Sequence, residues 1–170
     1  MSRALTTDRL EVRPLTAADV EAVFTVHSDA ATMADVRWQT MTERREAEER
    51  VVSELANERD TGFGMYVLHE RQSGALVGLC GAARDGNGLE VGWTVLKRFQ
   101  SLGYATEAAS ALIGDIETAG WPEVVAKIRP SNLASRRVAE KLQFDLDAAV
   151  TDEYGELLIF KRSRSSASPR

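Results

Sequence analysis

The sequence predicts a mixed α+β fold, with about seven strands in a central, mostly antiparallel sheet and four helices. Three observations carry this prediction. Residues 65–95 form three strand-like runs separated by turn residues, which is typical of an antiparallel meander. Apolar residues then recur at helical spacing over residues 105–116. A short apolar run follows at 124–128, and a strand–helix–strand unit of this kind implies a right-handed crossover between parallel strands.

The N-terminal segment predicts one strand and one helix. Residues 10–13 alternate as a strand does and stop at Pro14, which cannot donate to a ladder. Thr16 and Asp19 fit a capping box, and the apolar residues behind them recur at helical spacing. His27 lies on this apolar face, so we expect it to pack there rather than bind a ligand.

A second helix is predicted to begin at Thr42, after an irregular stretch over residues 29–41. Its many charged residues, from 43 to 59, indicate a solvated face. Its predicted apolar positions are Val51, Val52 and Leu55.

Two turns divide the meander into predicted strands at 65–70, 76–83 and 89–95. Ser73 and Gly74 join the first two strands. The sequence Asp-Gly-Asn-Gly at 85–88 joins the last two, and it is a strong hairpin signal because Asn and Gly tolerate positive φ.

The C-terminal half contains the most regular helix of the chain, which ends at Gly120. A short helix is predicted over residues 132–142, and two strands are predicted around 144–150 and 157–160. Residues 1–162 are therefore predicted to form one domain. The serine-rich residues 163–170 are predicted to be a disordered tail.

Composition limits the class of protein. The 170 residues are 44% hydrophobic and 28% charged, which is typical of a globular domain. No apolar run approaches the roughly 18 residues that a membrane-spanning helix needs. The polar N-terminus lacks the apolar stretch of a signal peptide, so we expect a cytoplasmic protein without a membrane partner.

Metals and nucleic acids are both disfavoured as ligands. Cys80 is the only cysteine, and His27 and His69 are too far apart for a helical metal motif, so no metal is expected. The formal net charge is −5, and no basic stripe with interleaved aromatic residues is present. Nucleic acid is therefore not an expected partner.

The segment from Gln100 to Ala105 connects a predicted strand to the most regular predicted helix. In such a turn, free backbone amides and the positive end of the helix dipole point at one place, which suits a phosphate or diphosphate. Gly103 would let the chain approach an anion, and Ser101 and Thr106 could add hydroxyl donors. The same residues would also suit an ordinary turn in which Gly103 only eases the bend.

Two separated segments resemble the GNAT acetyltransferase superfamily, in the branch of ribosomal-protein-alanine and ribosomal-protein-serine N-terminal acetyltransferases. Residues 100–105 fit the signature Q/R-x-x-G-x-G/A, and residues 132–144 are similar to the branch's N-x-x-S and V-A-E-K-L-G-F. Gln143 replaces the glycine of the second motif, which predicts strain if that turn needs positive φ. Residues 7–15, 77–78 and 90–93 are similar to the branch as well, so the resemblance spans nearly the whole chain.

The resemblance implies a GNAT-type fold, in which one parallel strand pair splays apart, and acetyl transfer from acetyl-CoA to an amine. The family holds the coenzyme diphosphate on loop amides and lays the pantetheine beside the preceding strand, whose backbone also polarises the thioester carbonyl. Asn132 matches the asparagine that holds the cofactor where the strands part, although it would also suit a helix N-cap. The expected coenzyme-binding residues are Trp93, Thr94, Val95, Gln100, Ser101, Leu102, Gly103, Tyr104, Ala105, Thr106, Asn132 and Ser135.

The resemblance also suggests an acid and a base. Many members place a tyrosine seven residues after the asparagine to protonate the departing thiolate, but Ala139 stands there. Ser135 fits the alternative that this branch uses, and a serine at that position would equally suit a cap. Glu90, on the central strand, is the expected base, with Glu156 as the second candidate.

The acceptor is not defined by these motifs. Family members modify protein N-termini and small-molecule amines, and the segments expected to select the acceptor here are residues 29–41, with Arg37 and Trp38, and the turn at 152–155. The sequence leaves three alternatives open: a non-catalytic coenzyme A-binding regulatory module, transfer of a longer acyl chain, and assembly into a homodimer.

Overall fold

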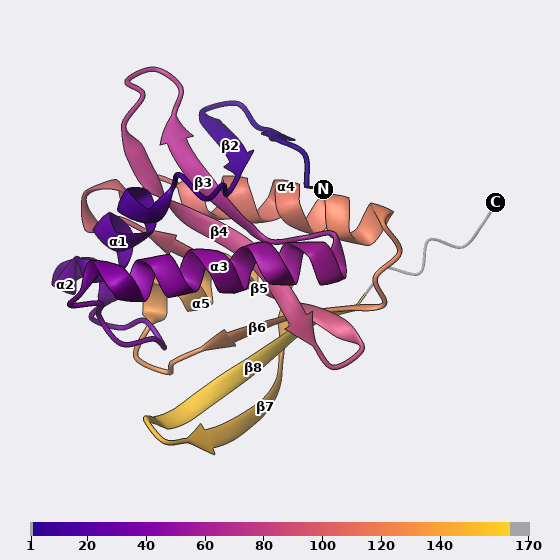
Figure 1. Cartoon of the computed structure of the whole chain (residues 1–170). Coiled ribbons are helices and arrows are strands. Elements are labelled where there is room, and N and C mark those ends of the chain that lie inside the picture. Colours follow the sequence, from indigo (N-terminus) through magenta and orange to yellow (C-terminus); the bar gives the residue numbers. More distant parts are fainter. Residues whose placement is uncertain (1, 164–170) are drawn as a thin grey trace.

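A mixed sheet of eight strands organises residues 2–163, the part of the chain that the computed structural model describes (Figure 1). Along the sheet the strand order is β1-β2-β3-β4-β5-β6-β8-β7. All neighbours are antiparallel except β5 and β6, which are parallel. The strands are β1 (Leu5–Thr6), β2 (Leu10–Pro14), β3 (Met65–Glu70), β4 (Leu76–Asp85), β5 (Gly88–Val95), β6 (Glu123–Ile128), β7 (Asp145–Asp152) and β8 (Gly155–Ser163).

Five α-helices within residues 2–163 complete the fold, so the mixed α+β class is confirmed. They are α1 (Val20–Ser28), α2 (Ala30–Met33), α3 (Arg44–Thr61), α4 (Tyr104–Thr118) and α5 (Leu133–Lys141), and a 3-10 turn lies at Lys97–Phe99. No helix of the described chain has the length and apolar content of a membrane span.

Two short elements make the predicted counts of seven strands and four helices wrong by one each. The extra strand is β1, whose Leu5 pairs with Val12 of β2. The extra helix is α2, which lies in the stretch predicted to be irregular. Asp29 caps α2 by accepting the backbone N–H groups of Ala31 and Thr32.

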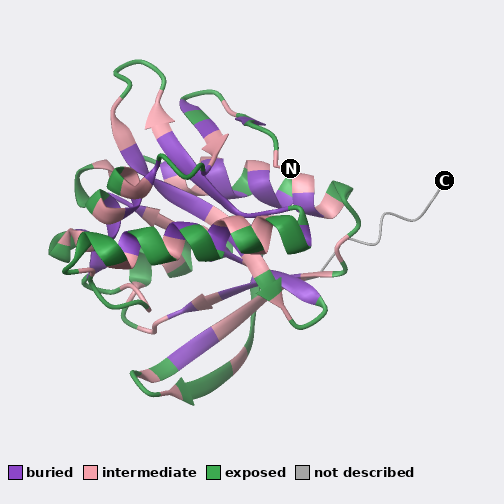
Figure 2. Cartoon of the chain, in the orientation of Figure 1, coloured by how far each residue is buried: buried purple, intermediate pink, exposed green. Residues whose placement is uncertain are grey.

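Helices cover both faces of the sheet, as Figure 1 shows. On one face, α1 and α3 pack Val23 and Val51 into an apolar cluster with side chains of β3 and β4. On the other face, α4 packs Leu112 and Ile116 against the sheet, so the predicted apolar face of this helix is confirmed. Figure 2 shows the buried residues concentrated along the central strands. Val52 points to solvent at 67% exposure, so its predicted place on the apolar face of α3 is wrong.

The turns follow the predicted chemistry. Asp85 pairs with Gly88 across a two-residue hairpin, and Gly86 takes a φ of +57°. Gln143 takes a φ of +61°, which is the strained conformation expected where the motif has glycine. Strand β8 runs to Ser163, one residue into the predicted tail, and the rest of that tail, 164–170, lies outside the described residues.

The capping box predicted for Thr16 and Asp19 is wrong, because Thr16 Oγ1 does not accept the N–H of Asp19 and the N-cap of α1 is Asp19 itself. The Asp19 carboxylate accepts the Thr16 N–H at 2.7 Å, and Thr16 Oγ1 accepts the Ala18 N–H at 3.3 Å. Because α1 begins at Val20, these bonds close the turn before the helix.

The two parallel strands separate soon after they meet. Strands β5 and β6 pair only at Leu89 with Val124 and at Glu90 with Val125, whereas β5 continues to Val95. Beyond Glu90, one edge of β5 has no strand beside it within the described chain, and this gap positions the candidate site.

Candidate active site

Two adjacent pockets lie where β5 and β6 part. The larger, about 500 Å³, is lined by the start of α4, the end of β5 and the start of α5. The smaller, about 330 Å³, is lined by β4, β5, β6 and α3. The residues that line both pockets are Val36, Trp93, Thr94, Asn132 and Ser135.

The loop before α4 presents free backbone donors to the larger pocket. Within the described chain, none of the backbone N–H groups of residues 103–106 donates a hydrogen bond. These are the orphan donors of a helix N-terminus, and the helix dipole adds positive potential at the same place. Gly103, Tyr104, Ala105 and Thr106 all line this pocket. The arrangement fits an anion such as a diphosphate.

The backbone of the loop is held in an unusual conformation. Ser101 has a φ of +65° and Gly103 a φ of +85°. A Cβ at Gly103 would lie 3.2 Å from Nη2 of Arg9, so glycine is needed here for its positive φ and for the approach of Arg9. Leu102 lines neither pocket. Its side chain is exposed, and its carbonyl accepts a hydrogen bond from Arg9.

The edge of β5 that faces the gap carries backbone groups of alternate residues. The N–H of Leu96 donates to the carbonyl of Val77 on β4. Along an antiparallel pair, only every second residue directs its N–H and C=O toward the partner strand, so on β5 these are Leu96, Thr94 and Gly92. Trp93 and Val95 therefore direct their N–H and C=O groups toward the free edge, where an extended ligand could pair with them. Thr94 directs its backbone toward β4, although it lines both pockets.

Two of the predicted residues also support the site internally. Gln100 Nε2 donates to the carbonyl of Val95 at 3.0 Å, so that acceptor is already used. Asn132 caps α5, because its Oδ1 accepts the N–H of Ser135 at 3.0 Å. Ser135 is half-buried and lines both pockets. Ala139 is fully buried in the core and lines neither pocket.

Glu90 lies in the smaller pocket, where two cations hold its carboxylate. Arg37 Nη1 lies 2.8 Å from Oε1, and Lys127 Nζ lies 3.3 Å from Oε2. Burial alone would lower the pKa of Lys127, but its contacts with Asp85 and Glu90 raise it overall. Glu156 is exposed and lines neither pocket.

The smaller pocket also contains a second carboxylate, which the sequence patterns do not single out. Glu54, on α3, is buried, and its Oε1 lies 2.7 Å from Arg50 Nε. Burial raises the pKa of Glu54, although the Arg50 charge opposes this effect. A desolvated carboxylate of this kind suits proton transfer near neutral pH.

Trp38 and His27 line the same pocket. Trp38 packs against the guanidinium groups of Arg37 and Arg50, at 4.0 and 5.4 Å from the ring centroid. His27 packs on the helix face as expected, and its Nδ1 has no hydrogen-bond partner among the described residues. Burial, helped by the Arg50 charge, lowers the pKa of His27 to about 4, so the ring is neutral at pH 7.

The turn at 152–155 reaches the smaller pocket through Arg129, which is one of its lining residues. The Asp152 carboxylate accepts two hydrogen bonds from Arg129 Nη2, each 2.8 Å long. A hydrogen bond from the Tyr154 N–H, together with Arg129, lowers the pKa of Asp152. Of the two segments expected to select the acceptor, 29–41 lines this pocket through Val36, Arg37 and Trp38, whereas 152–155 lies behind Arg129 and does not line it.

Cys80 lines the smaller pocket but is not activated for nucleophilic attack. Burial raises the pKa of its thiol to about 12, so it stays protonated at neutral pH. Among residues 2–163, no group of three or more His, Cys, Asp or Glu side chains is arranged to hold a metal ion.

Comparison with known proteins places these features in one family. The family model described as "Acetyltransferase (GNAT) domain" matches residues 9–145. A Bacillus subtilis (strain 168) protein known only as the uncharacterized protein YkkB is 25% identical, over 93% of this chain and 94% of its own length.

Solved structures agree in fold over almost the whole chain. A Bordetella pertussis protein assigned to the GnaT family of acetyltransferases is 28% identical, with a TM-score of 0.81 over 95% of this chain and 99% of its own. RimL, a ribosomal-protein acetyltransferase solved in complex with coenzyme A, is 19% identical, with a TM-score of 0.82 over 95% of this chain and 98% of its own. The family match covers the splayed strands, the loop and the start of α5, and the chain belongs to the GNAT acetyltransferase family.

Proposed function

We propose that this acetyltransferase moves an acetyl group from acetyl-CoA to a primary amine, either a protein N-terminus or a small molecule. The observation that carries the proposal is that the two pockets lie side by side and share lining residues. One presents free amides that suit a diphosphate, and the other contains carboxylates that suit an amine. They meet beside the free edge of β5, at Trp93, Thr94, Asn132 and Ser135.

The residues of the larger pocket fit acetyl-CoA, which would supply a thioester as the acyl donor. The N–H groups of residues 103–106 would bind the diphosphate. The free N–H groups of Trp93 and Val95 would pair with the pantetheine arm, and one of them would stabilise negative charge on the thioester oxygen. RimL, which shares the fold, was solved in complex with coenzyme A, and this supports coenzyme A as the ligand.

Two groups at the junction would handle protons. A primary amine is mostly protonated at neutral pH, so Glu90, directly or through water, would remove one proton before the nitrogen attacks the carbonyl carbon. The new C–N bond forms as the C–S bond breaks. Ser135 Oγ would donate a proton to the departing sulfur, and the second proton lost by the nitrogen would return to Ser135 Oγ, directly or through water. The products are an amide, a free thiol and one proton released to solvent.

The acceptor would enter through the smaller pocket. Its walls combine Trp38 and Trp93 with the paired charges of Arg37, Glu90 and Glu54. This mixture of flat apolar surface and carboxylates suits an amine attached to a polar chain. The likeness in fold to RimL favours N-terminal peptides as the first acceptors to test.

Thiol release from acetyl-CoA across a panel of peptides and small amines tests the proposal. We expect release with at least one primary amine, and thermal stabilisation of the protein by coenzyme A alone. Longer acyl-CoA donors in the same assay test the choice of acyl chain. Stabilisation without thiol release on any amine would favour the non-catalytic module, and the absence of both would refute coenzyme binding.

A further inference from the structure

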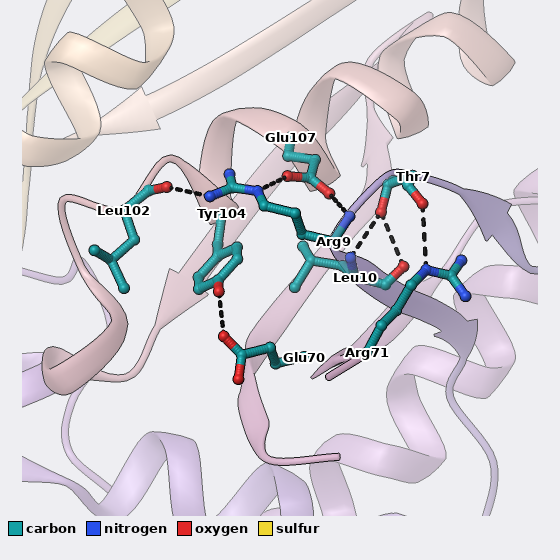
Figure 3. Close-up of polar contacts among 8 residues, drawn as sticks. All are labelled: Thr7, Arg9, Leu10, Glu70, Arg71, Leu102, Tyr104 and Glu107. Atoms are coloured by element: carbon teal, nitrogen blue, oxygen red, sulfur yellow. Dashed lines mark hydrogen bonds and ion pairs between the residues drawn. The ribbon is translucent and has the colours of Figure 1, made fainter. Parts of the chain in front are cut away.

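Arg9, immediately before β2, reaches across to the loop that precedes α4 (Figure 3). Its Nη1 donates to the carbonyl of Leu102 at 2.8 Å, and its Nε donates to Glu107 Oε2 at 2.7 Å. The guanidinium also lies over the Tyr104 ring, 4.5 Å from the centroid. One side chain therefore contacts the loop and the first turn of the helix together.

The backbone of Arg9 is itself fixed in place. Its N–H donates to Glu107 Oε1 at 2.8 Å, and its carbonyl accepts the N–H of Arg71 at 2.9 Å. Thr7 Oγ1 closes the turn before it, by donating to the carbonyl of Leu10 and accepting the Leu10 N–H. Burial raises the pKa of Glu107, but the hydrogen bonds from Arg9 outweigh this and lower it overall. The pair is therefore charged at neutral pH.

The hydrogen bond from Arg9 to the Leu102 carbonyl determines the direction of the Gly103 N–H. No peptide bond of the described chain is cis, and in a planar trans peptide the C=O and N–H point in opposite directions. Because the Leu102 carbonyl points at Arg9, the N–H of Gly103 points away from Arg9. Gly103 lines the larger pocket, and its N–H has no partner among residues 2–163. Glycine tolerates many orientations of its flanking peptides, so Gly103 does not fix this direction by itself.

We propose that Arg9 is a positioning residue, which holds the Leu102–Gly103 peptide so that the Gly103 N–H faces the diphosphate of the coenzyme. This inference rests on the proposed function, because it assigns that diphosphate to the larger pocket. Arg9 acts through the loop and does not itself contact the ligand. Lysine would replace it only in part, because an ammonium lacks the planar fork that directs separate N–H donors to Glu107 and the Leu102 carbonyl while the guanidinium lies over Tyr104.

The test compares wild type, Arg9→Gln, Arg9→Lys and a matched control, Arg3→Gln. Arg3 is also an arginine paired with a carboxylate of α4, but it is highly exposed and its partner Asp115 lies eight residues beyond Glu107, away from the loop. We expect coenzyme A to bind roughly tenfold more weakly to Arg9→Gln by calorimetry, with an intermediate loss for Arg9→Lys and none for Arg3→Gln.

An NMR readout separates positioning from general damage. In ¹⁵N-labelled wild type, saturating coenzyme A should shift the amide proton signals of Gly103 and Val95. In Arg9→Gln, the shift at Gly103 should fall by at least half, whereas the shift at Val95 should stay, because the β5 edge does not depend on Arg9.

Three results would overturn the inference. Wild-type affinity together with a full Gly103 shift in Arg9→Gln would show that Arg9 does not orient this amide. Equal losses at Gly103 and Val95 would indicate a general structural role. A flatter salt dependence of coenzyme A binding in Arg9→Gln would show direct ion pairing with the phosphates. If wild type bound no coenzyme A, the proposed function would fail and the inference with it.

Discussion

Replacing Gly103 by alanine separates a ligand-binding role of this glycine from a purely conformational one. Gly103 and Gly120 flank α4 with nearly equal backbone angles, φ +85° and +87°. A left-handed residue with a Cβ costs about 1–2 kcal/mol, so each Gly→Ala change should lower stability by about that amount. For a chain of this size, 1 kcal/mol corresponds to roughly 2–4 °C in Tm. The two variants should therefore melt at similar temperatures.

Their binding of coenzyme A should differ. A Cβ at position 103 would lie 3.2 Å from Arg9, whereas a Cβ at position 120 would meet nothing within 4 Å. We expect Gly103→Ala to weaken coenzyme A binding about tenfold by calorimetry, because it disturbs the loop amides, and Gly120→Ala to leave it unchanged. Equal affinity in both variants would refute the reasoning, since Gly103 would then only ease the bend.

Three further predictions concern the protons of the site. Glu90→Gln should lower kcat by about 10²-fold, whereas Glu54→Gln should mainly raise the KM of the acceptor; the reverse pattern would make Glu54 the base. Ser135→Ala should lower kcat with acetyl-CoA at least tenfold and leave the Kd of coenzyme A within about twofold, and an unchanged kcat would restrict Ser135 to packing beside the cap. The pKa of His27 is about 4 in the folded protein and 6.5 in the unfolded chain. The free energy of unfolding should therefore be unaffected by His27 above pH 6.5 and should fall by about 3 kcal/mol as the pH drops to 4. In urea titrations, His27→Gln should flatten this dependence, and an unchanged slope would contradict the assignment.

The regular elements could be predicted because their signals are local. Helix α4 repeats its apolar residues every three or four positions over four turns, and the 85–88 hairpin has its own turn residues. Strand β1 has two residues and α2 has four, which is too short for any periodicity to register. Tertiary pairing with β2 and capping by Asp29 form these elements.

The loop and the start of α5 could also be predicted, because each is a contiguous motif. The surroundings of Glu90 could not, since its partners Arg37 and Lys127 lie 53 and 37 residues away and reach it only through the fold. Glu54 was missed for a related reason. It belongs to a helix with charges on most sides, and only the packing of α3 on the sheet decides which of them becomes buried.

A crystal structure with coenzyme A bound would examine the central idea, that the free amides before α4 hold the diphosphate and place the sulfur between the splayed strands. We predict diphosphate oxygens within hydrogen-bond distance of the backbone nitrogens of residues 103–106, and the sulfur beside Ser135. A diphosphate bound elsewhere, with those nitrogens covered by the protein's own side chains, would contradict it.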